Sequence, residues 1–282
     1  MSAPGSAAVV ELLDDLRDES EELDRLVARL GPEGWQLATP SPGWSVAHQI
    51  AHLAWTDRAA LLAVTDPEAF AGESGKGQSG AGERGAGEPG AARAGSGSAV
   101  DEAAAAGAAL PSAELLYRWR DGRARLRDAL SGAAPGARFP WFGPPMSGAS
   151  MVTARLMETW AHGQDIADAL GVRREPTARL RHVAWIGVRA RDYAYLVRGE
   201  QPPADPFRVE LTGPGGEFWA YGPEGAAQRV TGPALDFCLL VTQRAHRADV
   251  SVRAEGQDAD HWLDIAQAFA GPAGEGREPK GA

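Results

Sequence analysis

The spacing of apolar residues changes near residue 200, and this change constrains the fold more than any other feature of the sequence. Upstream, apolar side chains recur every three or four residues, the spacing of one helix face, over 9–30, 45–62, 112–130, 150–170 and 177–198. Downstream, short runs alternate between apolar and polar residues, as in 207–211. The sequence therefore predicts a two-domain α+β protein, with a four- or five-helix bundle followed by a small α+β domain.

We expect the boundary between the two domains near residues 201–203, where Gln-Pro-Pro interrupts the helical pattern. Residues 1–200 would then form the bundle and residues 205–270 the second domain. In this second domain the pattern predicts strands at 207–211, 218–221 and 250–253, a strand ending at Val230, and helices at 233–244 and 262–269.

Glycine is concentrated in one part of the chain. Residues 71–100 hold 10 of the 35 glycines, and Val100 is the only large aliphatic residue among them. Such a segment cannot bury enough apolar surface to offset the entropy of ordering it, which predicts a flexible insertion in the bundle. The last residues, 271–282, have a similar composition and are expected to form a disordered tail.

Composition excludes several classes of protein. The 282 residues carry a net charge of −10, whereas a nucleic-acid-binding protein needs a basic surface. The single cysteine rules out a disulfide framework and a cysteine-rich zinc site. The sequence has no apolar run long enough to span a membrane, and acidic residues near its start argue against a signal peptide. We therefore expect a cytoplasmic protein that acts on a small molecule, with neither nucleic acid nor membrane as a partner.

Three residues on two predicted helices have the chemistry of metal ligands. Glu158 and His162 are four residues apart, so they share one helix face, and His52 on the helix at 45–62 can meet them from across the bundle. Two imidazoles and a carboxylate would leave a coordination position open, as in catalytic zinc sites. Spacing alone also fits the ordinary alternative, in which these residues are polar side chains without a ligand.

Two neighbouring residues have open roles at this stage. His48 shares a helix face with His52, and it can be exposed, support a ligand, or act as a fourth ligand. Asp165, three residues after His162, can orient that histidine or be an ordinary polar residue of the helix.

Two segments resemble a known family. PSPGWSVAHQIAHLAWTDRAALL and, about a hundred residues later, RLMETWAHGQDIADALG are similar to the mycothiol-dependent maleylpyruvate isomerase family, whose N-terminal domain is a DinB-like metal-binding bundle. The resemblance implies a divalent metal, usually zinc, on His52, Glu158 and His162. It also implies mycothiol as a cosubstrate and a sterol-carrier-like second domain at 205–270. His48 and the glycine-rich insertion depart from the family pattern.

The single cysteine, Cys238, bears on whether the chain itself can supply a reacting thiol. Cys238 lies in the apolar segment PALDFCLLVTQ, where a cysteine is normally inert packing, so a reacting thiol must come from outside the chain. We expect a zinc-dependent enzyme that uses a low-molecular-weight thiol such as mycothiol for isomerisation of, or transfer to, a small electrophilic metabolite. The alternatives are a thiol-independent metal-dependent hydrolase, lyase or cyclase, and a non-catalytic metal- or ligand-binding protein.

Substrate-binding residues are less defined by the sequence. A substrate carboxylate would favour an arginine, and the candidates are Arg155, Arg229, Arg244 and Arg247, each of which can equally be a solvated surface charge. Four tryptophans can be either core residues or pocket walls, because spacing does not separate these uses: Trp44, Trp55, Trp141 and Trp160.

Overall fold

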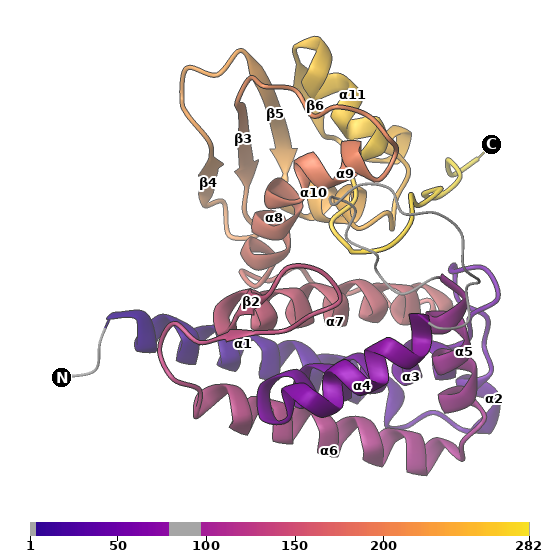
Figure 1. Ribbon diagram of the computed structural model, residues 1–282. Helices are drawn as coiled ribbons and strands as arrows, with labels where there is room; N and C mark the ends of the chain where they lie inside the picture. The colour runs from indigo at the N-terminus through magenta and orange to yellow at the C-terminus, as the bar shows by residue number, and fades with distance from the viewer. Residues whose placement is uncertain (1–3, 79–96, 282) are drawn as a thin grey trace. The chain divides into compact units, whose positions relative to one another are not determined.

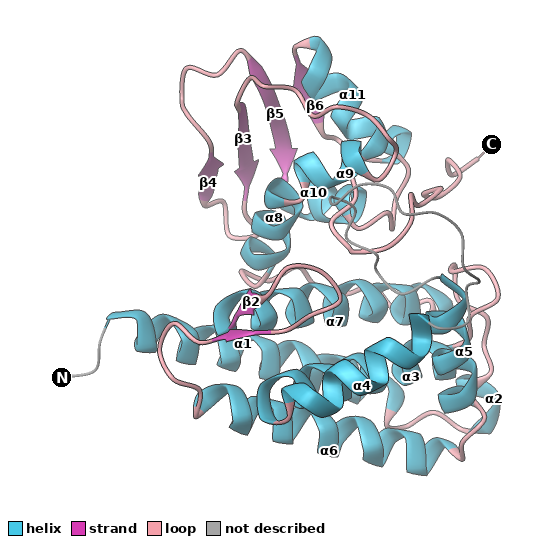
Figure 2. Cartoon of the chain, in the orientation of Figure 1, coloured by secondary structure: helices cyan, strands magenta, loops and turns pink. Residues whose placement is uncertain are grey.

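The computed structural model of the chain describes residues 4–78 and 97–281. The chain divides into two compact units, Met1–Arg173 and Arg174–Ala282 (Figure 1). The described residues of the first unit form helices and a short two-stranded hairpin, and the second unit combines helices with a four-stranded sheet (Figure 2). The predicted two-domain α+β fold is confirmed.

The first unit contains seven helices and two short strands among its described residues: α1 (Pro4–Val27), α2 (Pro32–Trp35), α3 (Val46–Thr65), α4 (Pro67–Gln78), α5 (Gly97–Ala108), α6 (Ser112–Ser131), β1 (Arg138–Phe139), β2 (Met146–Ser147) and α7 (Gly148–Leu170). Helix α3 packs against α4, α5, α6 and α7, and α1 packs against α7 (Figure 1). The core between them is built from the apolar faces that the sequence predicts, including Leu23, Ile50, Leu115, Trp119 and Ile166. Helix α3 is thus the central helix of the bundle, and α7 is one of the helices that pack against it.

The second unit contains α8 (Leu180–Arg189), α9 (Arg191–Leu196), β3 (Phe207–Thr212), β4 (Phe218–Tyr221), β5 (Gln228–Pro233), α10 (Ala234–Val241), β6 (Arg253–Glu255) and α11 (Gln257–Ile265). The strand order is β4-β3-β5-β6, with β3 and β5 parallel and the outer pairs antiparallel. Alternate residues of β3 are buried, and the ring of Phe207 meets that of Trp262 at 5.7 Å between centroids.

The division between the units falls at residues 173 and 174, earlier than the boundary expected near 201–203. The predicted helix at 177–198 is interrupted at Ala190, and its first part, α8, packs against α10 of the second unit. Contact between these helices is so close that a Cβ at Gly187 would lie 2.7 Å from Val241. The packing of α8 against α10, which is close because Gly187 has no side chain, places this helix in the second unit.

Both glycine-rich segments contain regular or hydrogen-bonded structure at positions where none is expected. Within the expected insertion at 71–100, the residues up to 78 continue α4 and those from 97 begin α5, while 79–96 lie outside the described residues. In the expected tail, the Gly271 carbonyl accepts a hydrogen bond from the Tyr193 hydroxyl at 2.6 Å, and the Gly274 carbonyl accepts one from Arg198 at 3.0 Å. Backbone carbonyl groups hold this segment in place through hydrogen bonds. Amino-acid composition does not predict such contacts, because every residue carries the same backbone groups.

No helix in the described part of the chain has both the length and the apolar character that crossing a membrane requires.

Candidate metal centre

The two helices that carry the candidate ligands have well-defined ends. Helix α3 begins after Ser45, whose hydroxyl lies 2.8 Å from Nδ1 of His48 and whose backbone N–H donates to the same atom at 3.3 Å. Helix α7 begins after Ser147, whose hydroxyl accepts the backbone N–H of Ser150, and ends at Gly171 in the left-handed conformation, with φ of 64°. These ends fix where each ligand lies along its helix.

The structure brings the three predicted ligands together. Oε2 of Glu158 lies 3.2 Å from Nε2 of His52 and 3.2 Å from Nε2 of His162. One ligand atom from each residue lies within 4.8 Å of the other two. His52 comes from α3 and the other two residues from α7, so helix packing across the bundle forms the group.

Hydrogen bonds from Thr39 through Gln49 to His162 determine which ring nitrogen of His162 carries the hydrogen. The other ring nitrogen presents its lone pair to Glu158. The Thr39 hydroxyl donates to the backbone carbonyl of Trp44 at 2.8 Å, so it accepts the hydrogen bond that Nε2 of Gln49 directs at it at 2.9 Å. The Gln49 amide oxygen therefore faces Nδ1 of His162, and these two atoms are hydrogen-bonded. With its hydrogen on Nδ1, neutral His162 presents a lone pair at Nε2.

This arrangement has the donor chemistry of a divalent metal site. The Nε2 lone pair of His162 faces a carboxylate oxygen at 3.2 Å, and two acceptors that face each other need a positive charge between them, either a proton or a metal ion. Ligand atoms bound tetrahedrally to zinc at about 2.0–2.1 Å are separated by about 3.3 Å, which matches the two nitrogen–oxygen distances. The residues present therefore fit a zinc-like ion.

The electrostatics of the group favour an ionised Glu158. Burial alone would raise the pKa of Glu158. When a proton takes the place of the metal between the carboxylate and the imidazoles, the hydrogen bonds and positive charge of His162 and His52 outweigh burial and hold this pKa well below its usual range. His52 is less constrained than His162, because its buried Nδ1 has no hydrogen-bond partner among the described residues. An ionised carboxylate beside two imidazoles is a suitable ligand set for a divalent cation.

Trp44 lies beside both histidines. Its ring is stacked on His162, with 5.9 Å between centroids and 17° between planes, and lies 5.4 Å from the ring of His52. The indole N–H of Trp44 donates to Asp101 of α5 at 3.0 Å. Trp44 is therefore a wall of the site, whereas Trp160, which is 5% exposed, is a core residue.

His48 and Asp165 have structural partners of their own. Nδ1 of His48 is hydrogen-bonded to Ser45, the residue before α3, so His48 stabilises the start of this helix. Asp165 is fully buried and accepts a hydrogen bond from the Ser41 hydroxyl at 3.0 Å, which ties α7 to the segment before α3. Neither belongs to the converging group of ligand atoms.

The four arginines proposed for a substrate carboxylate all contact other parts of their own unit. Arg155 is 2% exposed and donates to Asp57 at 2.9 Å, in a buried ion pair between α7 and α3. Arg229 pairs with Glu210 at 2.6 Å, Arg247 pairs with Asp264 at 2.6 Å, and Arg244 donates to the Thr242 carbonyl at 2.5 Å. These contacts favour structural roles for all four side chains.

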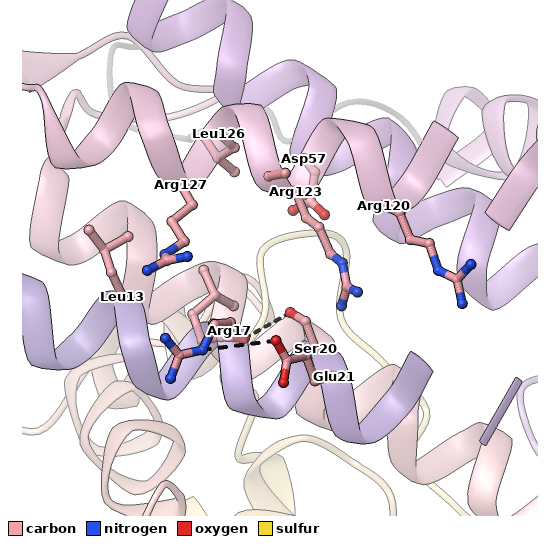
Figure 3. A pocket seen from close by; sticks show the side chains of 11 residues that line it. Leu13, Arg17, Ser20, Glu21, Asp57, Arg120, Arg123, Leu126 and Arg127 are labelled. Atoms are coloured by element: carbon pink, nitrogen blue, oxygen red, sulfur yellow. Dashed lines mark hydrogen bonds and ion pairs between the residues drawn. The ribbon is translucent and has the colours of Figure 1, made fainter. Parts of the chain in front are cut away.

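A separate hollow of about 200 Å³ lies between α1 and α6, lined in part by Arg17, Arg120, Arg123 and Arg127 (Figure 3). Its arginines are compensated by acids of α1: Arg120 and Arg123 both pair with Asp24, and Arg17 pairs with Asp18 at 2.8 Å. None of the three candidate ligands lines this hollow. Its charge balance gives no reason to assign it a ligand.

Gln49 is the site residue that the sequence does not reveal. It is fully buried and lies three residues before His52, on the same face of α3. A glutamine one helical turn before a candidate ligand could be recognised in the sequence as a residue near the site. The sequence does not show that its partner is His162, which is 113 residues away.

Two family models and two curated proteins match this chain. The family described as mycothiol maleylpyruvate isomerase N-terminal domain matches residues 16–167, and the family described as wyosine base formation matches residues 203–255. Two uncharacterised proteins of Mycobacterium tuberculosis, from strains H37Rv and CDC 1551, are each 55% identical over 93% of this chain and 96% of their own length.

Solved structures show the same fold. The crystal structure of the mycothiol-dependent maleylpyruvate isomerase has a TM-score of 0.55 and 18% identity, and that of a mutant of this isomerase has a TM-score of 0.55 and 17% identity. Each similarity covers 87% of this chain and 92% of the other. At this level of identity the likeness extends to the fold alone.

Proposed function

The chain belongs to the mycothiol-dependent maleylpyruvate isomerase family, and on this premise we propose that it is a zinc-dependent isomerase or thiol transferase. In this proposal His52, Glu158 and His162 hold the metal. A low-molecular-weight thiol such as mycothiol is the cosubstrate, and the substrate is a small electrophilic metabolite.

One observation carries the metal part of the proposal. The lone pair of His162, fixed by Gln49, faces the ionised carboxylate of Glu158 at 3.2 Å, and His52 faces the same oxygen. When bound, a divalent ion with two neutral imidazoles and one carboxylate keeps a net positive charge and an open position, and lowers the pKa of a thiol or water that binds there.

The proposed use of an external thiol is supported by the chain's single cysteine, which is poorly suited to react. Cys238 is fully buried in α10, and burial raises the pKa of its thiol well above the usual value. A thiol with a raised pKa is a poor nucleophile at neutral pH. In the proposed isomerisation the external thiol adds to a conjugated double bond, the resulting single bond rotates, and the thiol leaves with its proton restored. The thiol is therefore not consumed.

The residues of the bundle have separate tasks in this scheme. Gln49 holds the His162 ring in one tautomer, and Trp44 packs against both imidazoles. The Arg155–Asp57 pair links α7 to α3 one turn away from Glu158 and so holds the two ligand-bearing helices together.

Elemental analysis and thiol titration test the proposal together. Wild type purified in zinc-containing medium should carry about one divalent ion per chain, and His162→Ala should lose it. Mycothiol should bind the zinc-loaded wild type and not the metal-free protein. Cys238→Ser is the matched control and should retain both properties.

Two results would contradict the proposal in different ways. Equal metal content in wild type and in folded His162→Ala would refute the ligand assignment. Metal binding without any mycothiol binding would instead favour the thiol-independent hydrolase, lyase or cyclase.

A further inference from the structure

Aromatic side chains continue from the metal centre along one side of α3. The ring of Trp55, one turn after His52, lies 6.2 Å from the His52 ring. Trp55 is stacked on Phe142, with 5.7 Å between centroids and 23° between planes. The ring of Trp44 also lies beside His52, and we call these three residues the aromatic wall: Trp44, Trp55 and Phe142.

Two further aromatic rings pack against Phe142 of the wall. Phe142 lies 5.3 Å from Phe70 of α4 and 5.0 Å from Trp141, and Phe70 is stacked on Trp141 at 5.8 Å. Trp141 and Phe142 belong to the connection between β1 and β2, where three prolines restrict the backbone. The wall and the rings packed against it thus come from α3 and the residues before it, from α4, and from the connection between β1 and β2.

The wall remains partly open to solvent, unlike the aromatic residues of the core. Trp44, Trp55 and Phe142 are each of intermediate exposure, whereas Trp119 is fully buried. The Glu158 side chain beside them is 20% exposed. A small molecule that reaches the ligands can therefore contact flat aromatic surface at the same time.

The arginines that flank the ligands in the sequence are already paired. Arg155, three residues before Glu158, is buried against Asp57, and Arg58, six residues after His52, makes a two-point ion pair with Glu73 at 2.7 and 2.9 Å. A small dicarboxylate would need such a guanidinium for bidentate binding. Neither of these two guanidiniums can make such a bidentate contact without giving up its present partner.

We propose that the aromatic wall binds a planar conjugated or aromatic portion of a small substrate whose polar group binds the metal. The inference rests on the proposed function, because it places the polar end of the substrate at the metal held by His52, Glu158 and His162. Stacking on the partly exposed rings of Trp55 and Phe142 selects flat substrates over saturated ones of similar size.

Three hydroxamates that share one metal-binding group test the proposal with the full-length, zinc-loaded protein. Benzohydroxamate carries a flat ring, cyclohexanecarbohydroxamate a saturated ring of similar size, and acetohydroxamate no ring. Calorimetric titration should show benzohydroxamate binding about tenfold more tightly than acetohydroxamate, with the cyclohexyl compound in between. In Trp55→Leu and Phe142→Leu the tenfold ratio should fall to about threefold or less, while acetohydroxamate affinity is unchanged.

The control and the opposing outcomes separate this inference from the proposed function. Tyr117→Leu removes an aromatic ring of α6 that is 68% exposed, and it should leave all three affinities unchanged. Equal binding of the three hydroxamates, or an unchanged ratio in both wall variants, would overturn the aromatic wall and leave the metal centre intact. Failure of acetohydroxamate to bind zinc-loaded protein would overturn the metal centre and the wall with it.

Discussion

Gln49 offers the sharpest test of how the bundle prepares a metal ligand. Its amide connects Thr39 to Nδ1 of His162, and it is completely shielded from solvent. Gln49→Met keeps a side chain of similar length and volume but removes both hydrogen-bonding groups. The variant removes the Gln49 oxygen that accepts the Nδ1 hydrogen of His162, and it no longer fixes the tautomer that directs a lone pair at the metal.

Two effects of different size follow. Loss of a residue that orients a metal ligand typically lowers metal affinity about 10- to 100-fold, which corresponds to about 1.4–2.7 kcal/mol. A buried donor without an acceptor costs the metal-free protein about 1–3 kcal/mol of unfolding free energy. Competition with a chromophoric zinc chelator measures the first effect, and urea unfolding in the presence of a chelator measures the second.

Further variants distinguish orientation from simple destabilisation. Gln49→Glu keeps an oxygen facing Nδ1 of His162, so its zinc affinity should stay within about threefold of wild type or exceed it. Gln164→Met changes the same residue type at a partly exposed position of α7, where the Gln164 amide donates to Asp168 at 2.8 Å, and it should change neither quantity. Wild-type zinc affinity in folded Gln49→Met would refute the reasoning.

Two further predictions concern the polar groups that tie α3 to α7. Arg155→Met should lower the free energy of unfolding by about 3–5 kcal/mol because it leaves Asp57 buried without its partner, and the double variant with Asp57→Ala should recover part of this loss in urea titrations. The depressed pKa of Glu158 gives the metal-free protein stability that is complete above the unfolded-state pKa of about 4.3 and is lost as pH falls toward the folded-state pKa. Unfolding measured from about pH 7 to about pH 3 with a chelator should therefore show a flatter dependence in Glu158→Gln than in wild type, and identical pH dependence would count against an ionised Glu158.

The sequence predicts features that depend on local spacing. The helix start at Ser45 and the stop at Gly171 follow from cap chemistry, and both are found in the structure. The pairing of Glu158 with His162 on one face follows from helix geometry over four residues. The change from helical to alternating periodicity likewise predicts the two-domain α+β fold, because each period corresponds to one kind of element.

Tertiary structure decides the features that depend on residues far apart in the chain. Whether His52 meets Glu158 depends on how α3 packs against α7 across 106 residues of sequence, and this packing is the sum of many weak apolar contacts. The same packing makes Gln49 the partner of His162 and buries Arg155 against Asp57. The close approach at Gly187 assigns α8 to the second unit although its periodicity resembles that of the bundle helices. Local spacing thus determines which side chains share a face, and only the packing of faces determines what those side chains meet.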